Sequence, residues 1–127
     1  MHTSSAAKTI DRLIDSFPHE QQAQIRSMLA ESLRGIITQY LMTRQEGWGR
    51  IPAVEVLIGC PQLSHIIREA RTYQIHNVML TNKGLGMVTL DESLKDLLER
   101  GKIGEIEALE LANDLKEMRK SLTGGTE

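Results

Sequence analysis

The chain has 127 residues, of which 40% are hydrophobic and 25% are charged, which suits one small globular domain with a modest core. Its formal net charge of -2 and aromatic content of 3% argue against a nucleic-acid partner, which needs a basic surface or stacking rings. Cys60 is the only cysteine, so an internal disulfide and a four-cysteine zinc site are both excluded.

Two amphipathic helices are predicted in the first third of the chain. Ser and Thr residues at the polar start can cap the first helix, and Pro18 separates it from the second. The apolar stripe of the first helix is predicted to be Ile10, Leu13, Ile14 and Phe17. The second helix is predicted to bury Ile25, Met28, Leu29 and Leu33.

A β-hairpin is predicted next, because the residue pattern changes at Gly35. Segments 36–42 and 51–58 are rich in β-branched and bulky residues, which is typical of strands. The loop between them contains two glycines, so the strands are predicted to pair as an antiparallel hairpin.

Helices are predicted in the remainder of the chain. The first begins at Pro61, a favoured residue in an opening turn, and a polar region follows that includes a two-glycine loop at 81–87. The buried stripe of this helix is predicted to be Leu63, Ile66, Ile67 and Ala70.

The next helix has clear signals at both ends. Thr89 and Glu92 have the spacing of a capping box, and Gly101 follows the last turn. Its apolar face is predicted to be Leu90, Leu94, Leu97 and Leu98. We expect Leu94 and Leu97 to pack against the stripe of the preceding helix.

A last helical segment and a short tail complete the chain. The helical segment is predicted to bury Ile106, Leu109, Leu115 and Met118. The tail at 123–127 is predicted to be flexible, so the folded domain is expected to span residues 1–122. Two helices, a hairpin and then three or four helices indicate an α+β fold, a helical domain with a β-hairpin.

Three short motifs occur in order within this last part of the chain. They are Ile66-Ile67-Arg68-Glu69, Gln74-Ile75 and Gly86-Met87-Val88-Thr89-Leu90-Asp91. They closely resemble the end of the motor domain in the retraction ATPases of type IV pili, the PilT-like branch of the secretion ATPases. The likeness extends to residues 2–12, which resemble the histidine box of that family. The resemblance implies the C-terminal part of a RecA-like motor domain.

The resemblance also implies roles for particular residues. In the family, the histidine of the histidine box lies at the nucleotide site and senses or helps to hydrolyse ATP; that role falls on His2, unless His2 is simply a solvated side chain. Ile66, Ile67, Arg68 and Glu69 match a motif that couples subunits, although Arg68 and Glu69 could equally be a solvated helix pair. The sequence departs from that motif at Ser64 and His65, where the family has a basic residue and an asparagine.

No complete catalytic site is predicted within these 127 residues. A phosphate-binding loop needs G-x-x-x-x-G-K-[ST], and this string does not occur: Gly101-Lys102 is followed by Ile103. The magnesium-binding acid of the family precedes the histidine box and is also missing. His19, His65 and His76 have no metal-ligand spacing, so no metal site is predicted. Lys83 and its neighbouring glycines form either a phosphate cradle or, more simply, a loop that reverses the chain.

These observations lead to three hypotheses about function. The first is a C-terminal fragment of a cytoplasmic hexameric ATPase for pilus retraction (twitching motility), unable to hydrolyse ATP by itself. ATP and Mg²⁺ would then be cofactors of the parent family only, and the partners would be a homo-oligomeric ring and the pilus platform at the inner membrane. The second is an inactive or regulatory module that joins a complete motor. The third, a free-standing enzyme, lacks a nucleophile, metal cluster or phosphate loop.

One expectation concerns the surface of the fragment. In the family, a sheet precedes the histidine box and is covered by the helix that follows it. The stripe from Ile10 to Phe17 is therefore expected to be partly bare here and to promote self-association.

Overall fold

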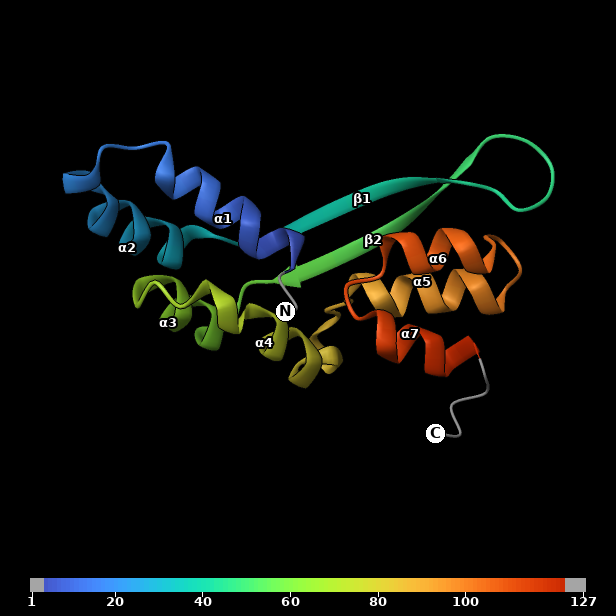
Figure 1. Cartoon of the computed structure of the whole chain (residues 1–127). Coiled ribbons are helices and arrows are strands. Elements are labelled where there is room, and N and C mark those ends of the chain that lie inside the picture. The colour runs from blue at the N-terminus through green and yellow to red at the C-terminus, as the bar shows by residue number, and fades with distance from the viewer. Residues whose placement is uncertain (1–3, 123–127) are drawn as a thin grey trace.

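The computed structural model describes residues 4–122, which form seven α-helices and one two-stranded sheet (Figure 1). The predicted α+β class is confirmed. The elements are α1 Ser5–Asp15, α2 Gln22–Ser32, β1 Gly35–Thr43, β2 Arg50–Ile58, α3 Pro61–Arg68, α4 Ile75–Thr81, α5 Leu90–Glu99, α6 Glu105–Leu111 and α7 Leu115–Leu122. His2 and the tail at 123–127 lie outside the described residues.

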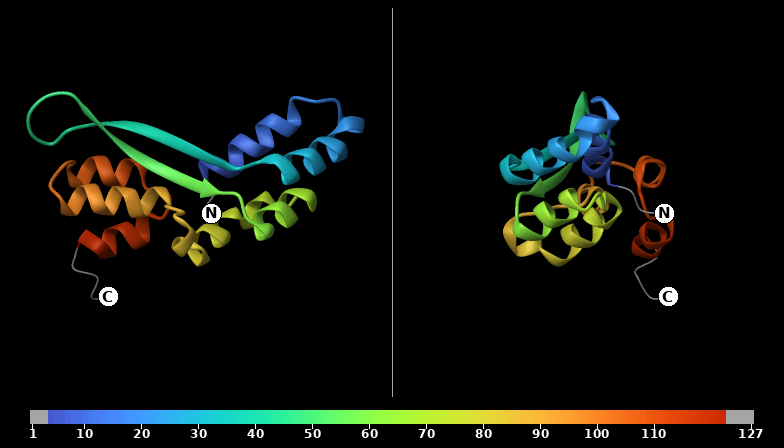
Figure 2. Two further views of the ribbon diagram at one scale, coloured as in Figure 1. Left: turned by 180° about the vertical axis from the view of Figure 1, so that it is seen from behind. Right: turned by 90° about the vertical axis from the view of Figure 1, so that its left-hand side faces the viewer.

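The hairpin is the central element of the fold. β1 and β2 pair antiparallel in one continuous register, from Gly35 opposite Ile58 to Thr43 opposite Arg50. Helices α1 to α4 surround the end where β1 begins and β2 finishes, and α5 to α7 lie along the half nearer the hairpin loop (Figures 1 and 2). The hairpin therefore connects two groups of helices.

The buried apolar side chains form two separate clusters, one in each group of helices. The first cluster comprises Ala6, Ala7, Ile10, Ile14, Ala30, Leu57, Leu63, Ile66, Ile67, Ile75, Val78, Met79 and Met87. The second cluster comprises Met42, Ala53, Leu90, Leu94, Leu97, Ile103, Ala108 and Met118. The hairpin contributes residues to both.

The prediction that Leu94 and Leu97 pack against the α3 stripe is wrong, because the two sets belong to different clusters. Helix α3 lies against α2, where the Ser64 hydroxyl donates to the Ala30 carbonyl at 2.7 Å. Helix α5 lies against β2 instead, where the Val54 N–H donates to Ser93 Oγ at 2.9 Å. Leu63, Ile66, Ile67, Leu94 and Leu97 are all buried as predicted, but the elements that the two stripes contact were not predicted.

The helix caps follow the sequence signals. Ser4 Oγ accepts the Ala7 N–H at 2.9 Å at the start of α1. Thr89 and Glu92 form the expected capping box at α5, since each side chain accepts the backbone N–H of the other residue. Gly101 follows α5 with a φ of 71°, a left-handed conformation that suits glycine.

Some residues of the predicted stripes are exposed. In α1 the buried face consists of Ile10 and Ile14 together with Ala6 and Ala7, so Leu13 lies at its edge and is 46% exposed. Met28 on α2 is also exposed. Because Ile10 and Ile14 are almost completely buried in the first cluster, the expectation of a bare stripe on this helix is wrong for these two residues.

Two further predictions about helix ends need correction. Ala70 is exposed and follows the end of α3 with a φ of 59°, so it terminates the helix rather than extending its stripe. The last helical segment is two helices, α6 and α7, and two residues of its predicted stripe, Ile106 and Leu115, are exposed. Within the described residues, no helix has the length and apolar character needed to cross a membrane.

Candidate functional site

The four residues of the predicted coupling motif lie at the end of α3 but have different environments. Ile66 and Ile67 are buried in the first cluster, where they help to hold α3 in place. Arg68 is the last residue of α3 and Glu69 is its C-cap, and both side chains are exposed. The charged half of the motif is therefore the half with exposed side chains.

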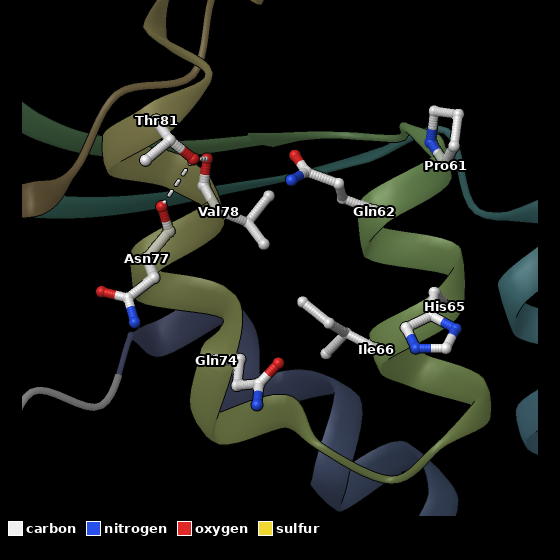
Figure 3. A pocket seen from close by; sticks show the side chains of 8 residues that line it. All are labelled: Pro61, Gln62, His65, Ile66, Gln74, Asn77, Val78 and Thr81. Atoms are coloured by element: carbon white, nitrogen blue, oxygen red, sulfur yellow. Dashed lines mark hydrogen bonds between the residues drawn. The ribbon is translucent and has the colours of Figure 1, made fainter.

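A groove of about 570 Å³ lies between α3 and α4, next to this motif (Figure 3). Ile66 connects the two features because it belongs to the motif and lines the groove. The lining residues are Pro61, Gln62, His65, Ile66, Gln74, Asn77, Val78 and Thr81. The groove thus includes His65, one of the two positions where the sequence departs from the family motif.

The groove is lined by polar and apolar groups, and His65 is its one ionisable side chain. No lysine, arginine, aspartate or glutamate is among its eight lining residues. Gln62 is partly engaged, since its Oε1 accepts a hydrogen bond from Asn82 Nδ2 at 2.8 Å. The Thr81 hydroxyl donates to the Asn77 carbonyl at 2.9 Å. Such groups suit hydrogen bonding to a polar ligand, and they offer no acid–base pair.

Helix α4, which forms one wall of the groove, was missed by the sequence reasoning, which assigned a polar turn region here. A usable signal was present: Ile75, Val78 and Met79 have the i, i+3, i+4 spacing of a buried helical stripe, and all three are buried.

A second set of polar contacts joins the N-terminus of α1 to the hairpin through two hydrogen bonds. Glu55 on β2 is only 1% exposed, and its Oε1 accepts the Ala6 N–H at 2.8 Å. The Tyr40 hydroxyl on β1 donates to Ser5 Oγ at 2.7 Å. Burial raises the pKa of Glu55, and the hydrogen bond from the Ala6 N–H acts in the opposite direction.

This arrangement holds the segment that directly follows the predicted histidine box. His2 itself lies outside the described residues, so its assignment to a nucleotide site stays a prediction. The role of Glu55 was missed because a glutamate within a strand pattern normally faces solvent. Its position alternates with the buried Ala53 and Leu57, which is the signal that places it on the core side.

The loop that contains Lys83 is held by ionic contacts within the chain. Lys83 Nζ lies 2.6 Å from Glu92 Oε2. Burial alone would raise the pKa of Glu92, but hydrogen bonds from Lys83 and Thr89 outweigh it and lower that pKa. This pairing favours a loop that reverses the chain over a phosphate cradle. Among residues 4–122, no group of three or more His, Cys, Asp or Glu side chains is arranged to hold a metal ion.

The chain is similar along most of its length to known proteins of type IV pili and twitching motility. No protein-family model matches the chain. It is 46% identical over 112 residues, 88% of its length, to the type IV pilus retractation ATPase PilT of Pseudomonas aeruginosa, and covers 32% of that protein. It is 40% identical over 118 residues, 93% of its length, to a twitching motility protein of Neisseria gonorrhoeae, and again covers 32% of the relative.

A solved structure gives the same result for the fold. The crystal structure of the pilus retraction motor PilT with bound ADP matches 94% of the chain with a TM-score of 0.78 and 35% sequence identity. The chain covers 33% of that structure. It therefore spans about a third of the length of the proteins that it matches.

Proposed function

We propose that this chain, which is homologous to the retraction ATPases of type IV pili along about a third of their length, serves as the C-terminal portion of such a motor. The observation that carries the proposal is the agreement of sequence and fold: 46% identity to one retraction ATPase and a TM-score of 0.78 to a solved retraction motor. In this role the chain would contribute to a hexameric cytoplasmic ring that hydrolyses ATP and contacts the pilus platform at the inner membrane.

The proposal gives the described residues distinct tasks. Arg68 and Glu69, exposed at the end of α3, would contact a neighbouring subunit, while Ile66 and Ile67 fix the direction of α3 from within the core. The fastening of α1 by Glu55 would hold the segment after His2 in place, so that His2 can reach a nucleotide bound elsewhere in the motor.

The 127 residues are not expected to bind or hydrolyse ATP by themselves. Charge-assisted contacts from a phosphate loop and its lysine provide much of the affinity for nucleotide phosphates, and the string that forms this loop does not occur in the sequence. Calorimetric titration with magnesium ATP and a phosphate-release assay test this point. Micromolar affinity or measurable turnover would contradict it.

A chimeric motor tests the proposed role directly. The chain replaces the matching residues of the P. aeruginosa retraction ATPase, and twitching and ATP hydrolysis are measured in a strain without the native motor. We expect both activities to be restored, and Arg68→Ala in the chimera to reduce them, whereas Arg119→Ala, an exposed arginine on α7, serves as the matched control. A chimera that assembles but neither hydrolyses ATP nor restores twitching would overturn the proposal.

A second candidate role is an inactive or regulatory module that joins a complete motor. The phosphate-loop string does not occur in the 127 residues, and such a subunit would occupy a place in the ring without hydrolysing ATP. Co-expression with a complete retraction ATPase separates the two: a module enters the intact ring and lowers its ATPase rate, whereas a portion of a motor acts only when joined to the remainder.

A further inference from the structure

Adjacent residues of β2 bond to the starts of two helices that are far apart in the sequence. Glu55 lies on the core side of the strand, and its Oε1 accepts the Ala6 N–H of α1 at 2.8 Å. The Val56 N–H donates to the Val88 carbonyl at 2.8 Å, and the Val88 N–H donates back to the Val56 carbonyl at 3.0 Å. The start of α1 and the segment that leads into α5 are therefore attached to neighbouring positions of one strand.

The attachment of α5 to β2 continues into the first turn of that helix, which lies beside the hairpin (Figure 1). The Val54 N–H donates to Ser93 Oγ at 2.9 Å. On its other side, α5 holds the start of α7, because the Asp91 carboxylate accepts the N–H groups of Asn113 and Asp114 at 2.8 and 2.9 Å. The contacts at residues 54 and 56 thus connect β2 to helices α5 and α7.

The Glu55 carboxylate makes β2 sensitive to the position of α1. Among residues 4–122, Glu55 is the one charged side chain that is buried. After burial and the backbone hydrogen bonds, the charges that act on its pKa are Asp91 on α5, which raises it, and Lys8 on α1, which lowers it. A buried carboxylate that loses its hydrogen-bond donor is destabilised until water reaches it. A retreat of α1 therefore favours displacement of β2 at Glu55.

The covalent geometry of the strand transmits such a displacement to the α5 side. The Glu55 carbonyl and the Val56 N–H belong to one planar peptide group, which turns as a unit. When Glu55 moves, the N–H group that donates to Val88 changes direction, and the pair of hydrogen bonds between Val56 and Val88 weakens.

We propose that residues 54–56 of β2 couple the start of α1 to the start of α5, so that loosening either attachment loosens the other. Coupling between two equilibria is reciprocal by thermodynamic necessity, so it can be measured from both sides. The inference concerns contacts within this chain and does not depend on the proposed function. In a motor, the same coupling would carry a movement of the segment after His2 to helices α5 to α7.

Amide hydrogen exchange of the 127-residue chain, followed by NMR at low urea concentrations, tests the coupling from the α1 side. Local opening is insensitive to urea and is thereby separated from global unfolding. Ser4→Ala removes the α1 cap, and we expect the urea-insensitive exchange of the Val56 and Val88 amides to become about fivefold faster. Ser64→Ala is the matched control. It removes the hydrogen bond to the Ala30 carbonyl and should change the same two amides by less than about twofold.

The reverse experiment starts from α5. Ser93→Ala removes the acceptor of the Val54 N–H, and the urea-insensitive exchange of the Ala6 amide should become faster by a similar factor. Circular dichroism must show that each variant stays folded. Agreement between the two directions supports the coupling, whereas acceleration in one direction only, or only in the urea-sensitive exchange, overturns it.

Replacing Glu55 tests whether the carboxylate carries the coupling. In a Glu55→Leu background, Ser4→Ala should change the exchange of the Val88 amide by less than about twofold, because the charge that responds to the position of α1 is gone. An effect of Ser4→Ala that persists at full size in this background would overturn the role of Glu55. Unchanged Val56 and Val88 amides in the single variant Ser4→Ala would overturn the proposal as a whole.

Discussion

Replacing Glu55 tests whether the fastening of α1 stabilises the fold. In Glu55→Ala the Ala6 N–H, bonded to the carboxylate at 2.8 Å, loses its acceptor in a buried position. A hydrogen bond to a charged group contributes about 1.5–3 kcal/mol, and relief of the carboxylate from burial offsets part of that loss. We therefore expect the free energy of unfolding in urea at pH 7 to fall by about 2 kcal/mol. Glu31→Ala, at an exposed position of α2, is the control and should change it by less than about 0.5 kcal/mol.

The pH dependence of the free energy of unfolding shows which effect on the pKa of Glu55 is larger, burial or the hydrogen bond from Ala6. Because burial raises its pKa above the usual 4.5, the folded protein binds this proton more readily than the unfolded chain does. The contribution of Glu55 to stability is therefore complete below pH 4.5 and decreases as pH rises through the folded-state pKa. Glu55→Gln cannot titrate, so the free energy of unfolding of wild type minus that of Glu55→Gln should fall over this range and then level off. A difference that rises with pH would refute the reasoning. It would mean that the hydrogen bond from the Ala6 N–H lowers the pKa of Glu55 more than burial raises it.

Three further substitutions test other parts of the fold, each by urea unfolding. Leu94→Ala, at a completely buried position, should cost about 2–5 kcal/mol, whereas Leu13→Ala, at a half-exposed one, should cost less than about 1 kcal/mol; equal losses would contradict the burial described. Ala70→Gly should stabilise the protein by about 1 kcal/mol, because its φ of 59° is unfavourable for alanine, and a destabilised variant would show that this conformation is not strained. Thr89→Ala should cost about 1 kcal/mol through loss of the α5 cap, and an unchanged midpoint would show that the cap contributes nothing.

Local signals in the sequence predicted the elements that depend on local chemistry. The expected strands at 36–42 and 51–58 differ from β1 and β2 by only one residue at each altered end. The capping box at Thr89 and Glu92 was placed correctly because both partners lie within four residues of each other. Such features require no knowledge of where the rest of the chain lies.

Features that depend on distant parts of the chain were not predicted. Leu94 and Leu63 have equally clear helical stripes, and no pattern in the sequence assigns them to different clusters. The contact of Glu55 with Ala6 spans 49 positions and requires the hairpin to bring β2 against the start of α1. The α3–α4 groove depends on the missed helix α4, although its stripe was visible in the sequence.

The candidate site was predicted only in part, by resemblance and by helical spacing. The resemblance located the motif at the end of α3, and the helical spacing separately predicted that Ile66 and Ile67 are buried, which the structure confirms, while Arg68 and Glu69 are exposed.

The division of the core into two clusters has a consequence for how the molecule unfolds. Because the hairpin is shared, the helices packed around Leu94 can detach while those packed around Ile67 keep their own buried contacts. Unfolding is then expected to proceed as two cooperative units rather than one all-or-none transition. A substitution in one cluster would shift the transition of that unit alone, and heat or denaturant would first yield a partly folded species that retains the helices at one end of the hairpin.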